Sequence, residues 1–496
     1  MNRKIIIAII ALIAIICAGA FAMTNSSTDA SVNVDASALE DRGNLIVNAK
    51  SLDESNGVYH SEDIDVNTVL VKNGGVLKLA NSIINKTGDT ASTGDDADFY
   101  GINSAVLVNT NGSADISDIE IITNSKGSNG IFVTNAEASP NGDSGQGSAG
   151  GQPPEAQGNG GQPPEMPEGG NIETVDGQGP GGSEEPGQTT VEGTTQATVK
   201  NVKITTHSDK SRGLDATYNG IINAENVVIN TDGQSCAGLA TDRGEGQVHV
   251  KNSEINTGVS KTSGRGSPLI YSTGNITLEN SKGTSYVSQI ACIEGKNSIE
   301  LTDCELTGYA EGNRKDGESY VDLGGIFIYQ SMSGDADVGT STFTAENSKL
   351  TIASDSSVYS EVPMFHVTNT ACVINLDNTE LSFGSGTFLE ISGQNQWGNE
   401  GSNGGVAELN TNNEKIEGNV IVDSISSLIW NMDNTEFSGA INSTGNTTVN
   451  VASGSTWTLT GDSTVSGLTL SGNIDYGEYT LTVNGQTYDS SNPYKG

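Results

Sequence analysis

The sequence predicts an all-β protein built as a parallel β-helix, with one long Gly/Pro-rich insertion. Three observations lead to this prediction: a motif centred on Asn or Asp that recurs along the chain, a high Gly content and a low aromatic content. Gly accounts for 63 of 496 residues, roughly twice its ordinary share, and aromatic residues account for 5%. So much Gly is unfavourable in helices, which excludes an all-α protein.

The recurring motif is φ-x-φ-x-[Asn/Asp]-x-x-φ, in which φ is an apolar residue and the Asn or Asp is here named the pivot. Alternation of period 2 places the φ residues on one face of a strand. Asn and Asp tolerate the left-handed backbone conformation, so a pivot turns the chain sharply between two strands. Ten pivots are present: Asn81, Asp118, Asn201, Asn226, Asn252, Asn280, Asp303, Asn347, Asn378 and Asn434.

The spacing of the pivots predicts the number of coils. From position 201 to 303 the pivots follow one another every 23 to 28 residues. We interpret the gap of 44 residues from 303 to 347 as two periods of 22, and the gap of 56 from 378 to 434 as two periods of 28. One coil cannot bury its own apolar face, but stacked coils bury a continuous column, and stacked Asn side chains hydrogen-bond along the stack. Without the insertion, the remaining residues predict roughly 15 coils.

The N-terminus has the pattern of an export signal. A basic segment at 1–4 is followed by an unbroken apolar run at 5–16 and by Ala20-Phe21-Ala22. This pattern predicts a secretory signal peptide at 1–22, with an uncleaved membrane anchor as the alternative. In either case we expect the rest of the chain to be extracellular or at the cell surface.

The remaining chain divides at a change of composition. We predict N-terminal coils at 31–136, a disordered insert rich in Gly, Pro and Glu at 137–193, and further coils with a C-terminal cap at 194–488. Four cysteines remain after cleavage, an even number that permits two disulfides. Their strand-like apolar surroundings favour buried free thiols instead; they are Cys236, Cys292, Cys304 and Cys372.

The chain resembles the exported, right-handed, pectin-lyase-like β-helix proteins, and more narrowly the adhesin-like surface proteins of methanogenic archaea and anaerobic gut bacteria. The resemblance rests on the signal segment, the pivots, the sequence Asp-Asp-Ala-Asp-Phe-Tyr-Gly at 95–101 and the ending at 481–488. It implies a right-handed β-helix and a location outside the cytoplasm. Because these motifs are structural, they imply little about chemical activity.

Charge narrows the possible partners. The chain has 61 Asp and Glu against 23 Lys and Arg, a formal net charge of −38. This charge repels polyanions and excludes a nucleic-acid binder. A single apolar stretch at the N-terminus excludes a multi-span membrane protein, so membrane contact is expected only through an uncleaved anchor. We expect a monomer.

Several strand segments place aromatic and acidic residues at outward positions. Aromatic rings beside carboxylates on a long sheet suit sugars, because they offer an apolar face and hydrogen-bond acceptors. We therefore predict a face that binds polysaccharide or cell-surface glycan, although ordinary solvated strand residues are the alternative for each position. Its candidate residues are Asp215, Asp242, Phe327, Tyr329, His366, Glu390 and Trp397.

The leading functional hypothesis is a non-enzymatic, adhesin-like protein. The first alternative is a polysaccharide lyase or glycoside hydrolase, for which Asp215, Asp232 and Asp242 are the candidate catalytic residues. Asp232 lies in an Asn-Thr-Asp-Gly sequence similar to one polygalacturonase motif, but the other motifs of that family are missing. The second alternative is a passive envelope component.

No cofactor is expected, with calcium as the alternative. Asp95, Asp96 and Asp98 form a dense group of oxygen ligands of the kind that calcium prefers. Solvated acidic residues in a turn explain the same pattern.

Overall fold

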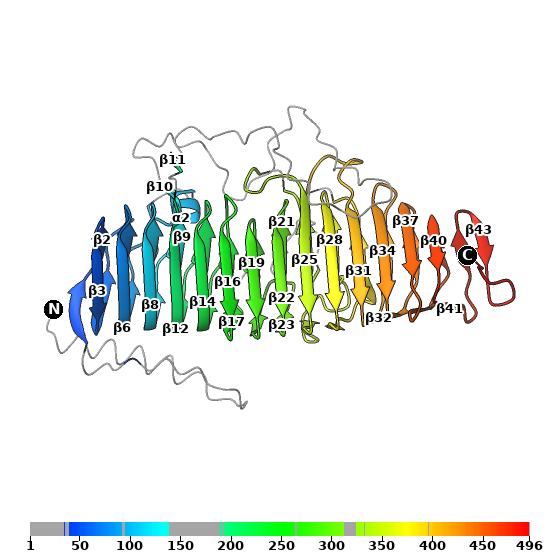
Figure 1. Ribbon diagram of the computed structural model, residues 1–496, viewed down its shortest axis with the longest axis horizontal. Helices are drawn as coiled ribbons and strands as arrows, with labels where there is room; N and C mark the ends of the chain where they lie inside the picture. The colour runs from blue at the N-terminus through cyan, green and yellow to red at the C-terminus, as the bar shows by residue number, and fades with distance from the viewer. Residues whose placement is uncertain are drawn as a thin grey trace. The chain divides into compact units, whose positions relative to one another are not determined.

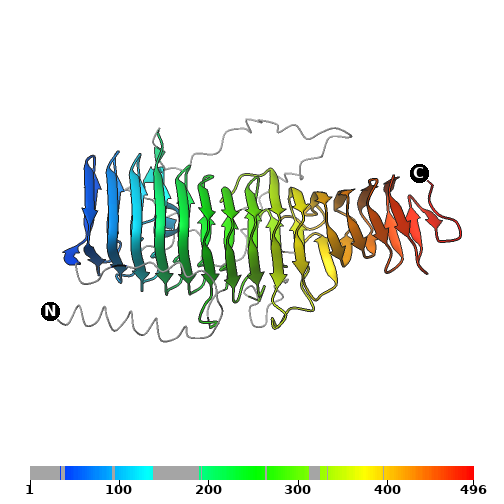
Figure 2. The same ribbon diagram turned by 60° about the horizontal axis from the view of Figure 1, so that its bottom comes forward.

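The structure is a computed structural model of the chain, and it describes residues 34, 39–91, 95–137, 189–190, 193–262, 265–311, 324–331, 333–394 and 396–495. The predicted signal peptide and most of the predicted insert lie outside the described residues. Within the described ranges, no helix combines the length and apolarity needed to cross a membrane. The coils stack in chain order, as the colours in Figures 1 and 2 show.

One wall of the stack is a sheet of 16 strands, here named the opposite sheet. Its strands pair in parallel except for the last, which forms an antiparallel hairpin, so the described chain contributes 16 − 1 = 15 parallel strands. This number agrees with the predicted coils. The strands are β2 (Leu45–Asn48), β5 (Val69–Lys72), β7 (Val106–Asn109), β9 (Ile131–Thr134), β13 (Leu214–Thr217), β15 (Leu239–Thr241), β18 (Ile270–Ser272), β21 (Ala291–Glu294), β24 (Ile326–Tyr329), β27 (Phe365–Thr368), β30 (Thr387–Ile391), β33 (Asn419–Val422), β36 (Ile441–Ser443), β39 (Ser463–Val465), β42 (Leu481–Val483) and β43 (Gln486–Tyr488).

A sheet of 21 strands, here named the pivot sheet, forms the wall that bends at the pivots. Its strands are β1 (Glu40–Gly43), β3 (Ser51–Ser55), β4 (Gly57–Ser61), β6 (Val76–Lys86), β8 (Ser113–Thr123), β12 (Gln196–Thr206), β14 (Ile221–Thr231), β16 (Gln247–Lys251), β17 (Glu254–Thr257), β19 (Asn275–Glu279), β20 (Lys282–Ser285), β22 (Ser298–Thr302), β23 (Glu305–Gly308), β25 (Thr340–Glu346), β26 (Lys349–Ile352), β28 (Ala371–Asp377), β29 (Glu380–Ser382), β31 (Val406–Asn412), β34 (Ser427–Asp433), β37 (Asn446–Val451) and β40 (Gly467–Leu470). Four short strands continue the bent side in the last coils: β32 (Lys415–Glu417), β35 (Glu436–Ser438), β38 (Thr456–Thr458) and β41 (Asn473–Asp475).

All ten predicted pivots have the left-handed backbone conformation, with φ between 42° and 55°. Their side chains form a ladder along the stack, for example from Asn226 Nδ2 to Asn201 Oδ1 at 2.6 Å and from Asn280 Nδ2 to Asn252 Oδ1 at 2.7 Å. Two further pivots, Asn56 and Asn413, extend the ladder and have φ of 59° and 53°. The predicted turn mechanism is therefore confirmed.

The interpretation of one long gap is wrong. β23 pairs directly with β26, Glu305 opposite Lys349, so the 44 residues between pivots 303 and 347 form one coil with an enlarged loop and not two coils. The gap from 378 to 434 does contain two coils, but the intermediate pivot Asn413 divides it into 35 and 21 residues instead of twice 28. Loop length varies without disturbing strand register, because loops lie outside the stack.

The predicted insert leaves the β-helix without changing its register. β8 pairs in parallel with β12, Ala114 opposite Ala197, exactly as successive coils pair elsewhere although 83 residues separate the partners. The ends of the insert lie side by side as the short antiparallel strands β10 (Ala136–Glu137) and β11 (Thr189–Thr190). The coils before and after the insert therefore form one continuous stack.

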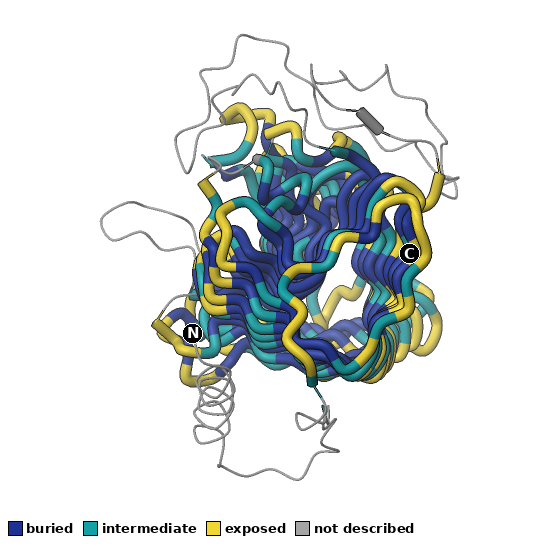
Figure 3. The backbone as a smooth tube through the Cα atoms, turned by 90° about the vertical axis from the view of Figure 1, so that its left-hand side faces the viewer, coloured by how far each residue is buried: buried dark blue, intermediate teal, exposed yellow. Residues whose placement is uncertain are grey.

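The core is the apolar column inside the coils. Viewed along the stack, buried residues recur at the same positions in successive coils (Figure 3). In the C-terminal half the column contains a run of aromatic rings with centroids 4.6 to 6.0 Å apart: Phe343, Phe365, Phe388, Trp430, Phe437 and Trp457. The four described cysteines are buried free thiols, in agreement with the alternative that the sequence favours.

Candidate functional site

The outer face of the opposite sheet carries most of the predicted site residues. Along its strands, inward residues such as Leu214, Ile270 and Ile326 belong to the core. The residues between them lie in register in one row on the outer face, here named the outer row: Leu107, Phe132, Asp215, Ala240, Tyr271, Cys292, Phe327, His366, Glu390 and Ile421.

The predicted residues fall into two groups along this face. Asp215 and Asp242 lie together over β13 and β15, whereas Phe327, Tyr329, His366 and Trp397 lie together over β24 and β27. Asp232 is in neither group. It follows β14 in the pivot sheet, where its Oδ1 accepts a hydrogen bond from Ser260 Oγ at 2.8 Å.

The first group is a buried charge cluster, defined as Asp98, Lys210, Arg212, Asp215 and Asp242. Arg212 donates to Asp98 Oδ1 at 2.6 Å and lies 2.7 Å from Asp242 Oδ2. Lys210 Nζ donates to the second oxygen of Asp98 at 2.6 Å. Asp215 is fully buried and only approaches Arg212 Nε, at 3.9 Å.

A short helix covers this cluster. α2 (Asp95–Tyr100) supplies Asp98 and lies over β13, where Thr217 Oγ1 donates to the carbonyl of Phe99 at 2.8 Å. The ring of Tyr100 stacks on Tyr218 with centroids 5.7 Å apart. The motif at 95–101 therefore caps the outer face of the sheet, and Asp215 and Asp242 lie beneath it with 0% and 5% of their surface exposed.

The three aspartates of the cluster have pKa values shifted in different directions. Burial opposes the charge of Asp98, but Arg212 and Lys210 outweigh it and lower the pKa of that carboxyl. Burial and the neighbouring Asp242 raise the pKa of Asp215 well above its ordinary value. Burial also raises the pKa of Asp242, to about 6, although Arg212 opposes this shift. Burial and Asp242 therefore favour the protonated form of Asp215, whereas Arg212 and Lys210 favour the charged form of Asp98.

The calcium alternative stays a prediction, because the side chain of Asp95 lies outside the described part of the chain and Asp96 and Asp98 already interact within it. Each oxygen of Asp98 binds one cationic side chain, Lys210 or Arg212. In the part of the chain that the structure describes, no group of three His, Cys, Asp or Glu side chains is placed to hold a metal ion.

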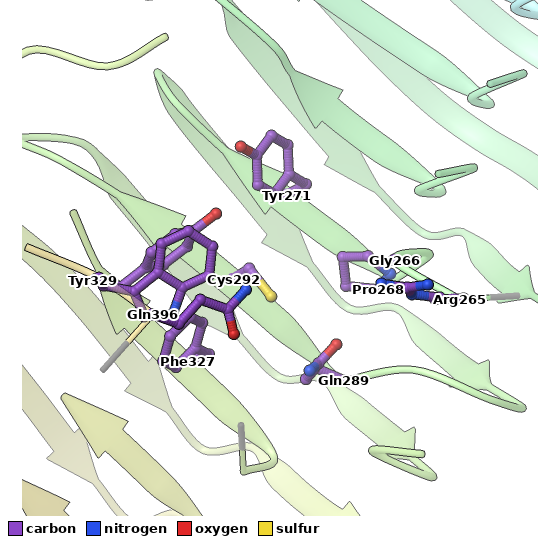
Figure 4. A pocket seen from close by; sticks show the side chains of 10 residues that line it. Arg265, Gly266, Pro268, Tyr271, Gln289, Cys292, Phe327, Tyr329 and Gln396 are labelled. Carbon is purple, nitrogen blue, oxygen red and sulfur yellow. The ribbon is translucent and has the colours of Figure 1, made fainter. Parts of the chain in front are cut away.

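Three residues of the second group, Phe327, Tyr329 and Trp397, line a pocket of about 160 Å³, here named the aromatic pocket. In Figure 4, Phe327 and Tyr329 lie on one side of the pocket and Pro268 lies on the other, with Cys292 and Gln289 between them. The pocket is lined by Arg265, Gly266, Pro268, Tyr271, Gln289, Cys292, Phe327, Tyr329, Gln396 and Trp397.

The aromatic rings pack closely against one another. Phe327 and Tyr329 stack with centroids 4.4 Å apart, and Trp397 lies 4.9 Å from Tyr329. Phe327 and Tyr329 are buried and form the base of the group, whereas Tyr271 and Trp397 are half-buried. Trp397 comes from the loop after β30, so the loop closes over strands that precede it by more than one coil.

His366 and Glu390 lie beside the aromatic pocket and do not line it. The rings of Phe327 and His366 are nearly perpendicular with centroids 5.6 Å apart, and Gln394 Nε2 donates to His366 Nε2 at 3.1 Å. Ser392 Oγ donates to Glu390 Oε1 at 2.9 Å. For all seven candidate residues, the role in ligand binding stays a prediction.

The sequence analysis missed more than half of the pocket. Tyr271 and Cys292 occupy the same outer row as Phe327, so extending the register of the strand alternation could have found them. Pro268 and Gln289 lie on the turns that enter β18 and β21. No pattern in the sequence indicates that these turns and the Trp397 loop meet.

A polar path joins the charge cluster to the aromatic pocket. Next to Asp242, Arg243 pairs with Asp335 at 2.5 Å, and Asp335 accepts from Ser333 Oγ at 2.8 Å. Ser333 Oγ in turn accepts from the hydroxyl of Ser331 at 2.8 Å, and the backbone N–H of Ser331 donates to Glu294 Oε1 at 3.2 Å. Glu294 accepts from the hydroxyl of Tyr271, a wall of the pocket, at 3.0 Å.

Comparisons with known proteins identify no family. No family model matches the chain, and no curated protein matches it. Among solved structures, the chain is similar to one described as the crystal structure of a TibC-catalysed, hyper-glycosylated TibA55-350 fragment, at 11% sequence identity and a TM-score of 0.24. The match covers 92% of this chain and 100% of that chain. A similarity at this level carries no argument about function.

Proposed function

We propose that the protein is an exported, adhesin-like β-helix that binds glycans in the aromatic pocket, at the cell surface or in secreted form. The observation that carries this proposal is the meeting of Tyr271, Phe327, Tyr329 and Trp397 on the outer face of the opposite sheet. Elsewhere in the chain, the largest group of aromatic rings fills the core. The two half-buried rings, Tyr271 and Trp397, leave part of their surface accessible to a ligand.

The chemistry of the pocket suits a sugar ring. Aromatic faces pack against the C–H face of a sugar, and polar groups at the rim fix its orientation. The pocket is smaller than the about 300–1,000 Å³ of typical small-molecule sites, which favours one terminal or side-branch residue of a glycan. The export pattern at 1–22 supports a location where the chain meets such glycans.

A glycan array tests the proposal, using the full chain with and without calcium, followed by analysis of the bound spots for released products. We expect binding without products, lost in Trp397→Ala. Half-buried Tyr309, which pairs with Tyr286 away from the pocket, provides the control variant Tyr309→Ala. Released products would establish an enzyme instead, and an array without any bound glycan would favour a passive envelope component.

A further inference from the structure

Two residues that line the aromatic pocket, Gln289 and Trp397, each have a buried hydrogen-bond donor without an acceptor within the described ranges. The Gln289 side chain is 1% exposed; its Oε1 accepts from Ser288 Oγ at 2.5 Å, but its Nε2 has no hydrogen-bond partner among the described residues. The indole Nε1 of Trp397 likewise has no partner in the described chain. Buried donors are almost always paired, and leaving one unpaired costs about 1–3 kcal/mol. Two such donors in one pocket indicate a ligand that supplies acceptors.

The rest of the pocket favours a neutral acceptor. Burial raises the pKa of Tyr271 and Tyr329 well above the ordinary value and that of the Cys292 thiol to about 12, so these side chains are uncharged at neutral pH. The buried Glu294 lies directly behind Tyr271. Among the described residues, Arg265 is the one cationic side chain that lines the pocket, and it already interacts within the chain.

The surroundings also act against an anion. The chain as a whole carries a formal charge of −38, which repels a carboxylate or sulfate approaching from solution. Apolar groups, meanwhile, make up much of the lining, including Pro268, Cys292 and Phe327. The described lining therefore combines apolar surface with two residues that have unpaired N–H donors, and its single cation, Arg265, is accompanied by the nearby Glu294 behind Tyr271.

We propose that the aromatic pocket recognises an N-acetylated sugar. The acetamide carbonyl accepts from Gln289 Nε2, its methyl group packs against the apolar lining, and Trp397 Nε1 donates to an oxygen of the same sugar. An acetamide combines an uncharged acceptor with a methyl group, which a plain hexose hydroxyl does not. The inference rests on the proposed function and names the class of glycan for that site.

Matched sugar pairs test the inference by calorimetry on the full chain. The probes are the methyl glycosides of glucose and N-acetylglucosamine, of galactose and N-acetylgalactosamine, and of glucuronic acid. We expect the acetamido member of at least one pair to bind about 10-fold more tightly than its parent sugar, the effect of one well-made hydrogen bond. In Gln289→Met the ratio should fall to near one.

Two further variants keep the test decisive. Trp397→Phe retains an aromatic ring but removes the Nε1–H, and we expect weaker binding of both members of the pair. Gln330→Met is the matched control: Gln330 is a buried glutamine outside the pocket lining, and its Nε2 donates to the carbonyl of Ala336 at 3.2 Å. The preference for the acetamido sugar should persist in this control.

Each other outcome overturns a distinct part of the account. Equal affinity for a sugar and its acetamido counterpart would refute the acetamide proposal while glycan binding stands. Tightest binding of the glucuronide would show that the donors recognise a carboxylate. No binding of any probe, in a chain whose thermal unfolding shows that it is folded, would contradict both the acetamide proposal and glycan binding in this pocket.

Discussion

Along the outer row, the segment over β13 and β15 and the segment over β21 and β24 have the same backbone geometry but opposite chemistry. In the first, α2 covers the sheet, and Arg212 compensates the charges of Asp98 and Asp242. In the second, aromatic side chains form a pocket in which Gln289 and Trp397 each have an unpaired donor. Beneath α2, both oxygens of Asp215 also lack a hydrogen bond to any described residue, so an unpaired buried atom indicates a ligand only where a pocket lies beside it.

The largest expected effect is loss of the cation at the centre of the charge cluster. Arg212→Met leaves Asp98 and Asp242 buried without their main partner, which should destabilise the chain by about 3–5 kcal/mol. Thermal and urea unfolding measure this effect. Arg243→Met is the control, because its pair with Asp335 is partly exposed, and it should cost clearly less. Equal losses in the two variants would contradict a special role for the buried cluster.

In the aromatic pocket, mutation should affect binding more than stability. Trp397→Ala removes a half-buried ring that contacts Tyr329, and we expect glycan affinity to fall about 10- to 100-fold, since one aromatic contact contributes on the order of 1–3 kcal/mol. Calorimetry measures the affinity, and unfolding experiments measure stability. If Trp397→Ala lost stability but kept its affinity, Trp397 would have a structural role, as the charge cluster does, and the proposed binding role would be contradicted.

The raised pKa of Asp215 predicts that the effect of Asp215→Asn on the stability of the chain depends on pH. Because its pKa is raised in the folded state, the folded chain binds the proton more tightly than the unfolded chain; the resulting stability is fully present below the unfolded pKa of about 4 and is lost as pH rises through the folded pKa. Asp215→Asn mimics the protonated form. It should be more stable than the wild type at pH 7, by about 1–3 kcal/mol, and nearly equal to it at pH 4.

Exposed Asp433 on the pivot sheet supplies the control for this experiment. At both pH values, Asp433→Asn should have nearly the same stability as the wild type. A gain in Asp215→Asn that is independent of pH would show that packing and not protonation explains it.

The smallest expected effect concerns the pivots, which both segments share. Asn226→Ala removes the hydrogen bond to Asn201. It also places Ala at φ 55°, a left-handed conformation that Ala adopts less readily than Asn, and we expect the two effects to cost about 1–2 kcal/mol of stability. Asn226→Gly tolerates this φ and should cost less. Hydrogen exchange of the neighbouring strands measures both variants, and a larger loss in the Gly variant would contradict the turn mechanism.

The fold could be predicted because each coil repeats the same local rule. The two missed pivots show where that rule weakens: Glu54 interrupts the apolar alternation before Asn56, and Thr411 does so before Asn413. Thr411 is nevertheless buried, where its Oγ1 accepts from Trp430 Nε1 at 3.0 Å. A polar residue satisfied inside the core has no signature in a motif that counts apolar residues.

Only the part of the site that lies on strands could be predicted, because alternation along a strand shows which residues face outward. Alternation placed Phe327 and Tyr329 on the outer face, and the structure brings them together with Trp397. It gave no indication that α2 buries Asp215, or that the turn before β21 brings Gln289 beside the rings. These contacts depend on how loops from different coils fold over the sheet, and loop length follows no period here.

Tryptophan fluorescence tests glycan binding in the aromatic pocket most directly. The chain has three tryptophans, of which Trp430 and Trp457 are fully buried in the core and Trp397 lines the pocket. Titration of the full chain with the methyl glycosides of N-acetylglucosamine and N-acetylgalactosamine should change the emission to saturation, and the change should vanish in Trp397→Phe but persist in Tyr309→Ala. Glycan binding detected by calorimetry without any change in emission would place the site elsewhere and contradict the account.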